Sequence, residues 1–328
     1  MYKLVGLAVS VLVALAALYS FSPRPMPEFE ATHVKPQRLL INGLAQAGPR
    51  VLAAGEQGHI LRSENRSGHW VEADIGTQRG STLTALHFVD ASTGVAVGHD
   101  GWILRTTDGG GRWDEVAFDG QRAEPLLGVA GGLGAPMVAV GAFGRLLQSD
   151  DQGRTWRARD VRQAGERHLN AVATAAGGRI LIGGEAGTLL RSADGGATWD
   201  RLPEIYNGSF FGVASLSPDE WVVWGMRGRV FRTRDFGQTW ERSRVPMDAA
   251  LFGGTVTPRG QIVLVGEGGV ILTSDDRGVS FQVRRSGGRL SLASALATAE
   301  GALYVAGEAG IHAETLDVVA TPGTAPKN

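Results

Sequence analysis

The sequence predicts an all-β protein: a seven-bladed β-propeller with four-stranded blades, preceded by an amino-terminal hydrophobic helix. An apolar run, Gly-x-x-Gly and an alternating apolar strand recur seven times, and in six copies a turn closing on an aromatic residue follows. The first glycine recurs every 41 to 43 residues, at Gly55, Gly98, Gly141, Gly184, Gly225, Gly266 and Gly307. A period in the low forties with several short strands per unit is typical of propeller blades.

A second marker repeats with the same period. The aromatic residue that closes the turn stands at Trp70, Trp113, Trp156, Trp199, Trp240 and Phe281. The second unit shows the four predicted strands, over Leu83–Phe88, Gly94–Val97, Trp102–Thr106 and Trp113–Val116. A helical repeat would instead need apolar residues three and four apart and few glycines, whereas this chain of 328 residues has 48 glycines.

Composition excludes several classes of function. The chain is 43% hydrophobic and 20% charged, so it can bury a core and is not disordered. A formal net charge of -1 supplies no general attraction for nucleic acid, which we do not expect as a partner. The absence of cysteine removes disulfides, thiolate nucleophiles and cysteine-ligated zinc sites. Stability must therefore come from packing.

The first 21 residues are predicted to be a signal anchor or a signal peptide. Leu4 to Phe21 carries no charge, and as a helix it would measure about 27 Å. The small-residue site at Ala14-Leu15-Ala16 lies inside the apolar run, which favours an uncleaved anchor; a cleaved signal is the alternative. With Lys3 on the cytoplasmic side, both readings place the rest of the chain in the periplasm, either on the inner membrane or free.

The remaining segments follow from composition and from the repeat. Residues 22–28 hold three prolines and are expected to form a stiff spacer, and residues 320–328 a flexible tail. The propeller is predicted over residues 29–319. Because the seventh unit lacks a closing turn, Phe29–Val34 is expected to complete its blade, which pairs the amino- and carboxyl-terminal strands. An independent edge strand is the alternative.

The repeated turn has the form Ser/Thr-x-Asp-x-Gly-x-Thr-Trp. Its aspartate is predicted to accept hydrogen bonds from nearby backbone N–H groups, its glycine to supply a positive φ, and its aromatic residue to pack into the sheet. These structural residues are Asp108, Asp151, Asp194, Asp235 and Asp276, with Trp113, Trp156, Trp199 and Trp240. Acids spread around a rim cannot converge on one substrate or one calcium ion, so no catalytic or metal role is assigned to them.

This turn resembles the Asp-box, or bacterial neuraminidase repeat. With blades such as Val-Gly-x-x-Gly-x-Leu-Leu-Arg-Ser-x-Asp-Gly-Gly-x-Thr-Trp, the stretch from about Phe29 to Val319 resembles the photosystem II stability and assembly factor family, in its non-photosynthetic bacterial branch. The resemblance implies an exported, often membrane-tethered propeller that binds an integral membrane protein complex and assists its assembly or operation. It also implies an RND-type exporter as a class of partner.

The alternative function is a carbohydrate-active or carbohydrate-binding propeller, similar to sialidases or glucanases, which share the box. The motif that opens the sialidase family is absent from the sequence. The loop acids are Glu56, Asp100, Glu185, Glu267 and Glu308, and four of them occupy one repeated Gly-Glu-x-Gly element. We interpret that element as part of the repeat. We therefore predict no catalytic residue, no cofactor and no metal.

In the implied fold, the loops between blades and the loops between second and third strands share one face, opposite the Asp-box turns. Arginine and aromatic residues in these loops are the candidates for partner binding, because interfaces are enriched in both. The candidates are Arg79, Arg122, Arg167, Arg227, Arg289, Tyr206 and Phe210. Solvated arginines without a partner are the alternative. Trp221 and Trp224 lie in an alternating strand and are predicted to be core residues.

Overall fold

The computed structural model describes residues 2–20, 35–63, 69–132 and 135–314. It divides into two units, Met1–Val34 and Lys35–Asn328. The first unit contains α1 (Tyr2–Ser20). Within the described ranges, no helix combines the length and the apolar content that a membrane crossing requires. How residues 1–21 are processed and attached stays a prediction, and the spacer at 22–28 and the tail lie outside the described residues.

The second unit is the predicted seven-bladed propeller of antiparallel sheets. The first blade consists of β1 (Ile41–Ala47), β2 (Arg50–Gly55), β3 (Ile60–Ser63) and β4 (Trp70–Glu72), and the second of β6 (Leu83–Phe88), β7 (Gly94–Gly98), β8 (Ile103–Thr106) and β9 (Arg112–Ala117). The third blade consists of β10 (Leu126–Gly132), β11 (Ala135–Gly141), β12 (Leu146–Ser149) and β13 (Arg157–Ala158), and the fourth of β14 (Leu169–Ala175), β15 (Arg179–Gly184), β16 (Leu189–Ser192) and β17 (Asp200–Arg201).

The other three blades follow in chain order. The fifth blade consists of β18 (Phe210–Ser215), β19 (Trp221–Gly225), β20 (Val230–Thr233) and β21 (Glu241–Arg242), and the sixth of β22 (Leu251–Val256), β23 (Ile262–Gly266), β24 (Ile271–Ser274) and β25 (Gln282–Arg285). The seventh contains β26 (Leu292–Ala297), β27 (Leu303–Gly307) and β28 (Gly310–Glu314). The short β5 (Asp74–Ile75) joins the second blade by parallel pairing with β9. The four strands predicted for the second unit are confirmed, with ends that differ by at most one residue.

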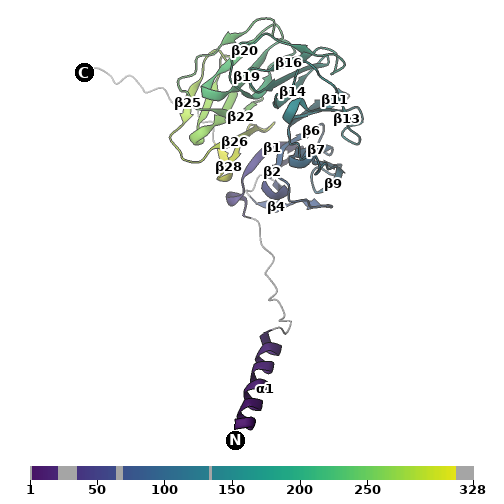
Figure 1. Cartoon of the computed structure of the whole chain (residues 1–328). Helices are drawn as coiled ribbons and strands as arrows, with labels where there is room; N and C mark the ends of the chain where they lie inside the picture. Colours follow the sequence, from purple (N-terminus) through teal and green to yellow (C-terminus); the bar gives the residue numbers. More distant parts are fainter. Residues whose placement is uncertain (1, 21–34, 64–68, 133–134, 315–328) are drawn as a thin grey trace, which may run out of the picture. The chain divides into compact units, whose positions relative to one another are not determined.

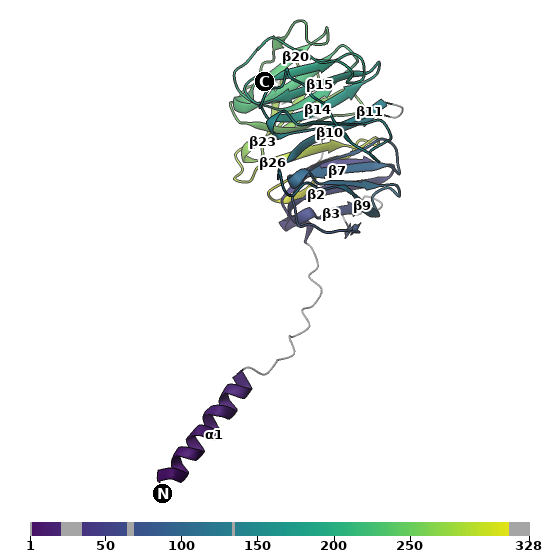
Figure 2. The same cartoon turned by 45° about the vertical axis from the view of Figure 1, so that its right-hand side comes forward.

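The blades are arranged radially, and the core lies between them. In Figure 1 the first strands, such as β1, β6, β14 and β22, lie toward the centre, and last strands such as β4, β9 and β25 lie outside; Figure 2 shows the same blades after rotation. The second strands β7, β19, β23 and β27 are buried at every residue. Apolar clusters span neighbouring blades: Leu181 and Leu189 pack with Phe210 and Trp221 of the next blade. This burial stabilises a chain that has no disulfide.

The backbone hydrogen bonds confirm the two predicted faces. On one face, the loop between two blades bonds the loop between second and third strands, as where Gly187 N–H donates to Gly208 O at 2.9 Å. On the other face, the Asp-box turn bonds the turn between first and second strands, as where Gly195 N–H donates to Gly178 O at 2.8 Å. We call the first face the corner face and the second the box face.

The Asp-box acids hold their turns as predicted. Asp194 accepts from Ser192 Oγ at 2.7 Å, from Thr198 N–H at 2.9 Å and from Thr198 Oγ1 at 2.6 Å. Ser192 Oγ in turn accepts from the N–H of Gly196, whose φ is +88°. Asp108, Asp151, Asp235 and Asp276 make corresponding bonds. Trp113 is fully buried, Trp199 is buried, and Trp156 and Trp240 are half-buried.

The box turns also fasten each blade to its neighbour. In three seams, an arginine of one blade donates to a box carbonyl of the next: Arg50 Nη1 to Asp108 O at 2.9 Å, Arg105 Nε to Gln152 O at 2.8 Å, and Arg191 Nη1 to Phe236 O at 2.8 Å. The ring of Phe236 is buried, with the guanidinium of Arg179 4.5 Å from its centroid. Polar groups of the box face are therefore largely engaged inside the propeller.

Acid should weaken the propeller through these turns. Bonds from the Thr155 backbone and side chain lower the pKa of Asp151 to about 2, and bonds from the Thr198 side chain and backbone lower the pKa of Asp194 to about 2. Both values lie below the ordinary aspartate pKa of about 3.9. This stabilisation is therefore complete above pH about 4 and is lost as the pH falls toward 2. Melting temperatures between pH 7 and pH 2 test this.

The matched variants for the acid experiment are Asp151→Asn and Asp194→Asn. Each should lower the melting temperature at pH 7 and flatten its fall between pH 4 and pH 2. Asp160→Asn changes an exposed carboxylate outside the boxes and serves as the control. A slope that stays unchanged in both box variants would contradict the assignment.

The ring closes where the first blade packs on the last. Gln46 of β1 donates from Nε2 to Glu300 at 3.2 Å and accepts from Ala299 N–H at 2.9 Å. The last sheet has three strands among the described residues, and the short helix η1 (Pro36–Arg38) contacts β28. The strand predicted at Phe29–Val34 lies outside the described residues, so its pairing stays a prediction.

Deletion of Phe29–Lys35 tests that closing strand. If it completes the last blade, its removal leaves β28 as an open edge, and the melting temperature should fall strongly. Removal of Ala320–Asn328 should leave the melting temperature nearly unchanged, because a tail contributes few contacts. Equal melting of the two truncated proteins would rule out the shared blade.

Candidate functional site

The corner face is built from the Gly-x-x-Gly elements, here called corners. The first glycine of a corner lies directly against the strand before it: a Cβ at Gly225 would stand 2.0 Å from Ser209 O, and one at Gly266 would stand 2.0 Å from Ala250 O. Any larger residue would push the first and second strands apart. The corner then turns tightly, and its third residue takes a positive φ, such as +53° at Gln57 and +56° at Arg227.

Four corners hold a glutamate whose carboxylate caps a backbone amide of its own blade. The bonds run from Leu40 N–H to Glu56 Oε1 at 3.0 Å, from His168 N–H to Glu185 Oε2 at 3.2 Å, from Ala250 N–H to Glu267 Oε2 at 3.2 Å, and from Ser291 N–H to Glu308 Oε2 at 2.8 Å. The interpretation of these acids as part of the repeat is confirmed. In the second blade, Asp100 accepts from Ser81 Oγ at 2.5 Å.

The third and fifth corners have no acid. In the third blade, Ala142 stands at the position of the glutamate. Pro125 stands at the position of the residue whose amide the glutamate binds, and proline has no N–H. In the fifth blade the residue to be capped is Ser209, and the corner residue is Met226. Among the described residues, the Ser209 N–H forms no hydrogen bond.

A pocket of about 330 Å³ opens at the fifth corner. It is lined by Tyr206, Ser209, Met226 and Arg227, with Glu185 and Ala186 of the fourth corner at its edge. Tyr206 is half-buried on Phe231, and its hydroxyl is 3.5 Å from Met226 O. Arg227 is exposed and forms no ion pair within the described part of the chain. Two predicted candidates, Tyr206 and Arg227, thus meet in one pocket.

The other predicted arginines have different surroundings. Arg79 forms two bonds with Glu115, at 2.6 and 2.8 Å, and its guanidinium lies 4.5 Å from the Phe118 ring centroid. Bonding to Glu115 raises the pKa of Arg79. Arg167 donates to Ala186 O at 3.3 Å. Both side chains are therefore engaged within the propeller.

Arg122 and Arg289 remain candidates for partner binding on the corner face. Arg122 is 71% exposed, with Asp119 4.0 Å away. Arg289 is exposed beside Leu290, which is 52% exposed, and both line a hollow of about 880 Å³ at the last blade. The signal for Leu290 was present in the sequence, since this apolar residue lies in the same loop as Arg289.

Phe210 has to be removed from the candidate surface. It is completely buried, because the first residue of every inner strand points into the core between blades. Its neighbour Phe211 is half-buried and lies 5.6 Å from Phe252 of the next blade, ring centre to ring centre. The predicted core residues Trp221 and Trp224 are confirmed as buried.

Phe143, an aromatic residue that the sequence places on the corner face, forms a contact there that the sequence does not predict. Phe143, the third residue of the third corner, is 60% exposed, and its ring packs edge-on against His168 with 5.1 Å between ring centres.

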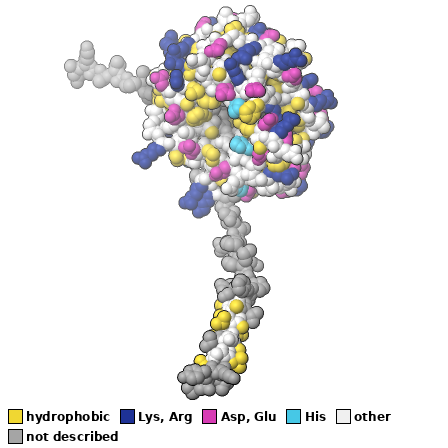
Figure 3. All heavy atoms as spheres, viewed as in Figure 1, with side chains coloured by type: hydrophobic (Ala, Val, Ile, Leu, Met, Phe, Trp, Pro, Cys, Tyr) yellow, Lys and Arg dark blue, Asp and Glu magenta, His cyan; other side chains and the backbone are white. Residues whose placement is uncertain are grey.

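Figure 3 shows hydrophobic side chains around the hollow at the centre of the propeller and most lysines and arginines toward its rim. Among the described residues, no group of three or more His, Asp or Glu is placed to hold a metal ion.

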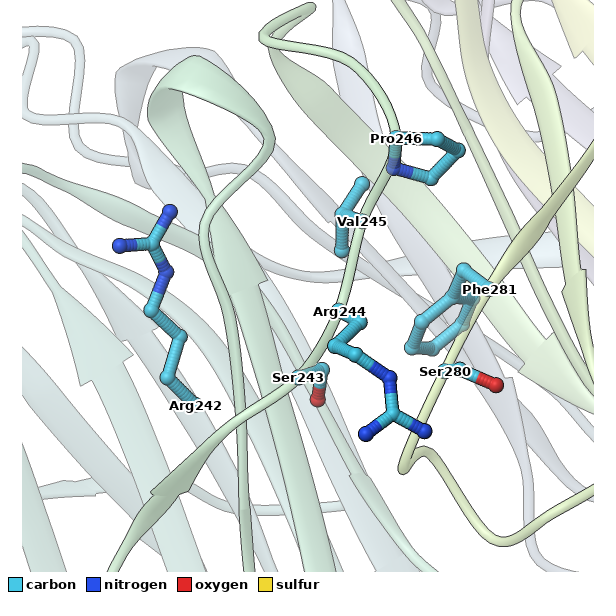
Figure 4. Close-up of a pocket in the computed structure, with 7 residues that line it drawn as sticks. All are labelled: Arg242, Ser243, Arg244, Val245, Pro246, Ser280 and Phe281. Atoms are coloured by element: carbon cyan, nitrogen blue, oxygen red, sulfur yellow. The ribbon is translucent and has the colours of Figure 1, made fainter.

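A further pocket, of about 570 Å³, lies at the seam between the fifth and sixth blades (Figure 4). Its walls are held together by backbone bonds: Phe281 N–H donates to Arg244 O at 2.9 Å, and Arg244 N–H donates to Val279 O at 3.0 Å. The Arg242 and Arg244 guanidinium groups lie apart in Figure 4. The pocket forms where two blades join, and its lining residues do not make up a cluster of catalytic or ligand-binding groups.

Comparison with known proteins agrees with this architecture. Residues 136–246, which run from β11 through β21, match the family model described as Photosynthesis system II assembly factor YCF48. Over this segment, which is about a third of the chain, the propeller is similar to YCF48. The matched segment contains three Asp-box turns and the fifth corner. The family resemblance predicted from the repeat is thereby confirmed. No curated protein sequence matches this one.

Solved structures resemble this propeller over most of the chain's length. YCF48 from Cyanidioschyzon merolae is 14% identical, with a TM-score of 0.67 over 85% of this chain and 96% of that one. A structure described as YCF48 bound to D1 peptide is 15% identical, with a TM-score of 0.65 over 88% and 98%. A streptogramin B lyase is 14% identical, with a TM-score of 0.72 over 87% and 97%. At these identities the likeness shows the fold alone.

Proposed function

We propose that this YCF48-like propeller is a non-catalytic, exported factor that binds an integral membrane protein complex on the periplasmic side of the inner membrane and assists its assembly or operation. The class of partner that we propose is an RND-type exporter. Residues 1–21 would tether the propeller to the membrane, or direct its export if they are cleaved.

One observation carries the proposal: the corner face combines unpaired arginines with exposed apolar side chains. On the box face, the aspartates and several arginines are bonded within or between blades. On the corner face, Arg227 and Arg289 form no ion pair within the described residues, Leu290 exposes apolar surface next to Arg289, and Phe143 exposes its ring. A surface that offers arginine and aromatic groups is suited to a protein partner. The structure of YCF48 with a D1 peptide supports a protein ligand for a propeller of this family.

Affinity purification tests the proposal. The chain, tagged at its carboxyl end, is captured from detergent-solubilised membranes, and co-purifying proteins are identified by mass spectrometry. We expect one integral membrane protein complex to be enriched over a mock capture, and its level to fall when the gene for the propeller is deleted. Turnover of a glycan or of another small molecule by the purified chain, without any membrane protein enriched, would favour the enzymatic alternative.

A further inference from the structure

We propose that the fifth corner is a subsite for one side-chain carboxylate, aspartate or glutamate, of the partner protein. This inference rests on the proposed function, because it names the group through which the partner is recognised. The subsite consists of the Ser209 N–H, the Arg227 guanidinium and the small pocket that both residues line.

The other blades show what this position binds. In the first, fourth, sixth and seventh blades, the amide that corresponds to Ser209 N–H donates to a glutamate carboxylate at 2.8 to 3.2 Å. The third blade has no amide there because of Pro125. The second blade keeps an acid one residue later, at Asp100. The fifth corner is thus the one that combines a donor amide with a sequence lacking any acid, Gly225-Met226-Arg227-Gly228.

The charge at the fifth corner fits an incoming anion. Arg227 lines the pocket, is exposed, and has no carboxylate within ion-pair distance among the described residues. The nearest acid in the pocket wall is Glu185, whose Oε2 already accepts the His168 N–H at 3.2 Å. A carboxylate that reached the Ser209 N–H would gain one amide bond, and Arg227 lines the same pocket and is available for one charge-assisted bond. Bonds of the second kind are about twice as strong as neutral ones.

The small volume of the pocket suits a single side chain. At about 330 Å³ the pocket is at the small end of ligand sites, so it accommodates a carboxyl group and its short stem. In the four corners that hold a glutamate, the side chain of that glutamate supplies the carboxylate at the corresponding amide. A partner loop carrying aspartate or glutamate would present the same group from outside.

The test uses the full-length chain in mild detergent, labelled with ¹⁵N-serine. The Ser209 amide signal is assigned as the one that disappears in Ser209→Ala. The probes are N-acetyl-glutamate N-methylamide, which offers a side-chain carboxylate, its glutamine analogue, and N-acetylglycine, which offers a terminal carboxylate. We expect a saturable downfield shift of the Ser209 amide with the glutamate probe. No saturable shift with that probe, or an equal shift with the glutamine analogue, would refute the subsite, and an equal shift with N-acetylglycine would refute a side-chain source.

Two variants sharpen the result. Arg227→Ala should weaken binding of the glutamate probe about tenfold, or about 1.4 kcal/mol. Met226→Glu should cap the Ser209 N–H from within, so that its signal is already shifted and no longer responds. Ala142→Glu is the matched control, because it places the same acid at the third corner, where Pro125 has no N–H. Unchanged probe binding in Met226→Glu, or equal loss in Ala142→Glu, would overturn the inference.

The same variants separate this inference from the proposed function. Capture of the membrane complex by the wild-type chain tests the function, and its failure would refute the function. If the wild type captures the complex and Met226→Glu captures it equally well, the function stands and the carboxylate subsite is wrong. We expect Met226→Glu to reduce capture and Ala142→Glu to leave it unchanged.

Discussion

Replacing Trp199 by alanine is expected to destabilise the propeller by about 3 to 5 kcal/mol, the range for removing a large buried aromatic side chain. Trp199 is buried in a cluster with Val161, Leu169 and Leu190, which come from two parts of the fourth blade and the loop before it. Chemical denaturation of the wild type and the variant measures the loss. A change below about 1 kcal/mol would contradict a core position for this residue.

A comparison of phenylalanine variants separates packing from hydrogen bonding. The Trp199 indole nitrogen is buried and has no acceptor among the described residues, whereas Trp113 Nε1 donates to Gly110 O at 3.3 Å. Trp113→Phe should therefore lose about 1 kcal/mol more than Trp199→Phe, because it alone gives up a bond. Equal losses would show that the Trp113 bond contributes nothing measurable.

The repeat explains why the fold could be predicted in detail. A blade is a local unit: its strands follow one another in sequence, and its turn chemistry lies within eight residues, as in Ser192–Trp199. Each of the repeated copies reports on the same geometry, so the spacing of the glycines and of the closing aromatics locates the strands to about one residue. The closing strand at Phe29–Val34 has no second copy to support it, and it stays a prediction.

The candidate site was harder to predict, because availability depends on contacts between distant residues. Arg79 is engaged by Glu115, 36 residues away in the sequence, and no local pattern indicates that pair. Arg227 has no such partner among the described residues, and its exposure likewise became evident only in three dimensions. Phe210 is a different case. It aligns with Leu169 and Leu251, the buried first residues of neighbouring inner strands, so a comparison of the copies would have placed it in the core.

The same comparison of copies could also have located the fifth corner. Four corners read Gly-Glu-x-Gly, so the departure to Gly-Met-Arg-Gly at Gly225–Gly228 was visible in the sequence. Its meaning was not, because the structure was needed to show that the missing glutamate leaves the Ser209 amide without a cap. In a repeat protein, a departure from the repeat indicates function only once the role of the repeated residue is known.

Charge reversal on the corner face should abolish partner binding. The double variant Arg227→Glu/Arg289→Glu changes two exposed arginines that form no ion pair among the described residues, so it should leave the melting temperature unchanged. Binding should be lost because interfaces concentrate their energy in a few arginine and aromatic residues, and reversal adds repulsion from any acidic group of the partner. Capture of the membrane complex by the tagged variant is the measurement.

The control variant has to change an arginine of the box face without breaking a contact between neighbouring blades. Arg277 is unsuitable because it pairs with Glu220 of the neighbouring blade. The Arg154 side chain is exposed and forms no hydrogen bond or ion pair within the described residues, so Arg154→Glu should fold and bind as the wild type does. If Arg154→Glu abolished capture and the corner-face variant did not, the partner would dock on the box face. The unpaired arginines of the corner face would then be ordinary solvated side chains.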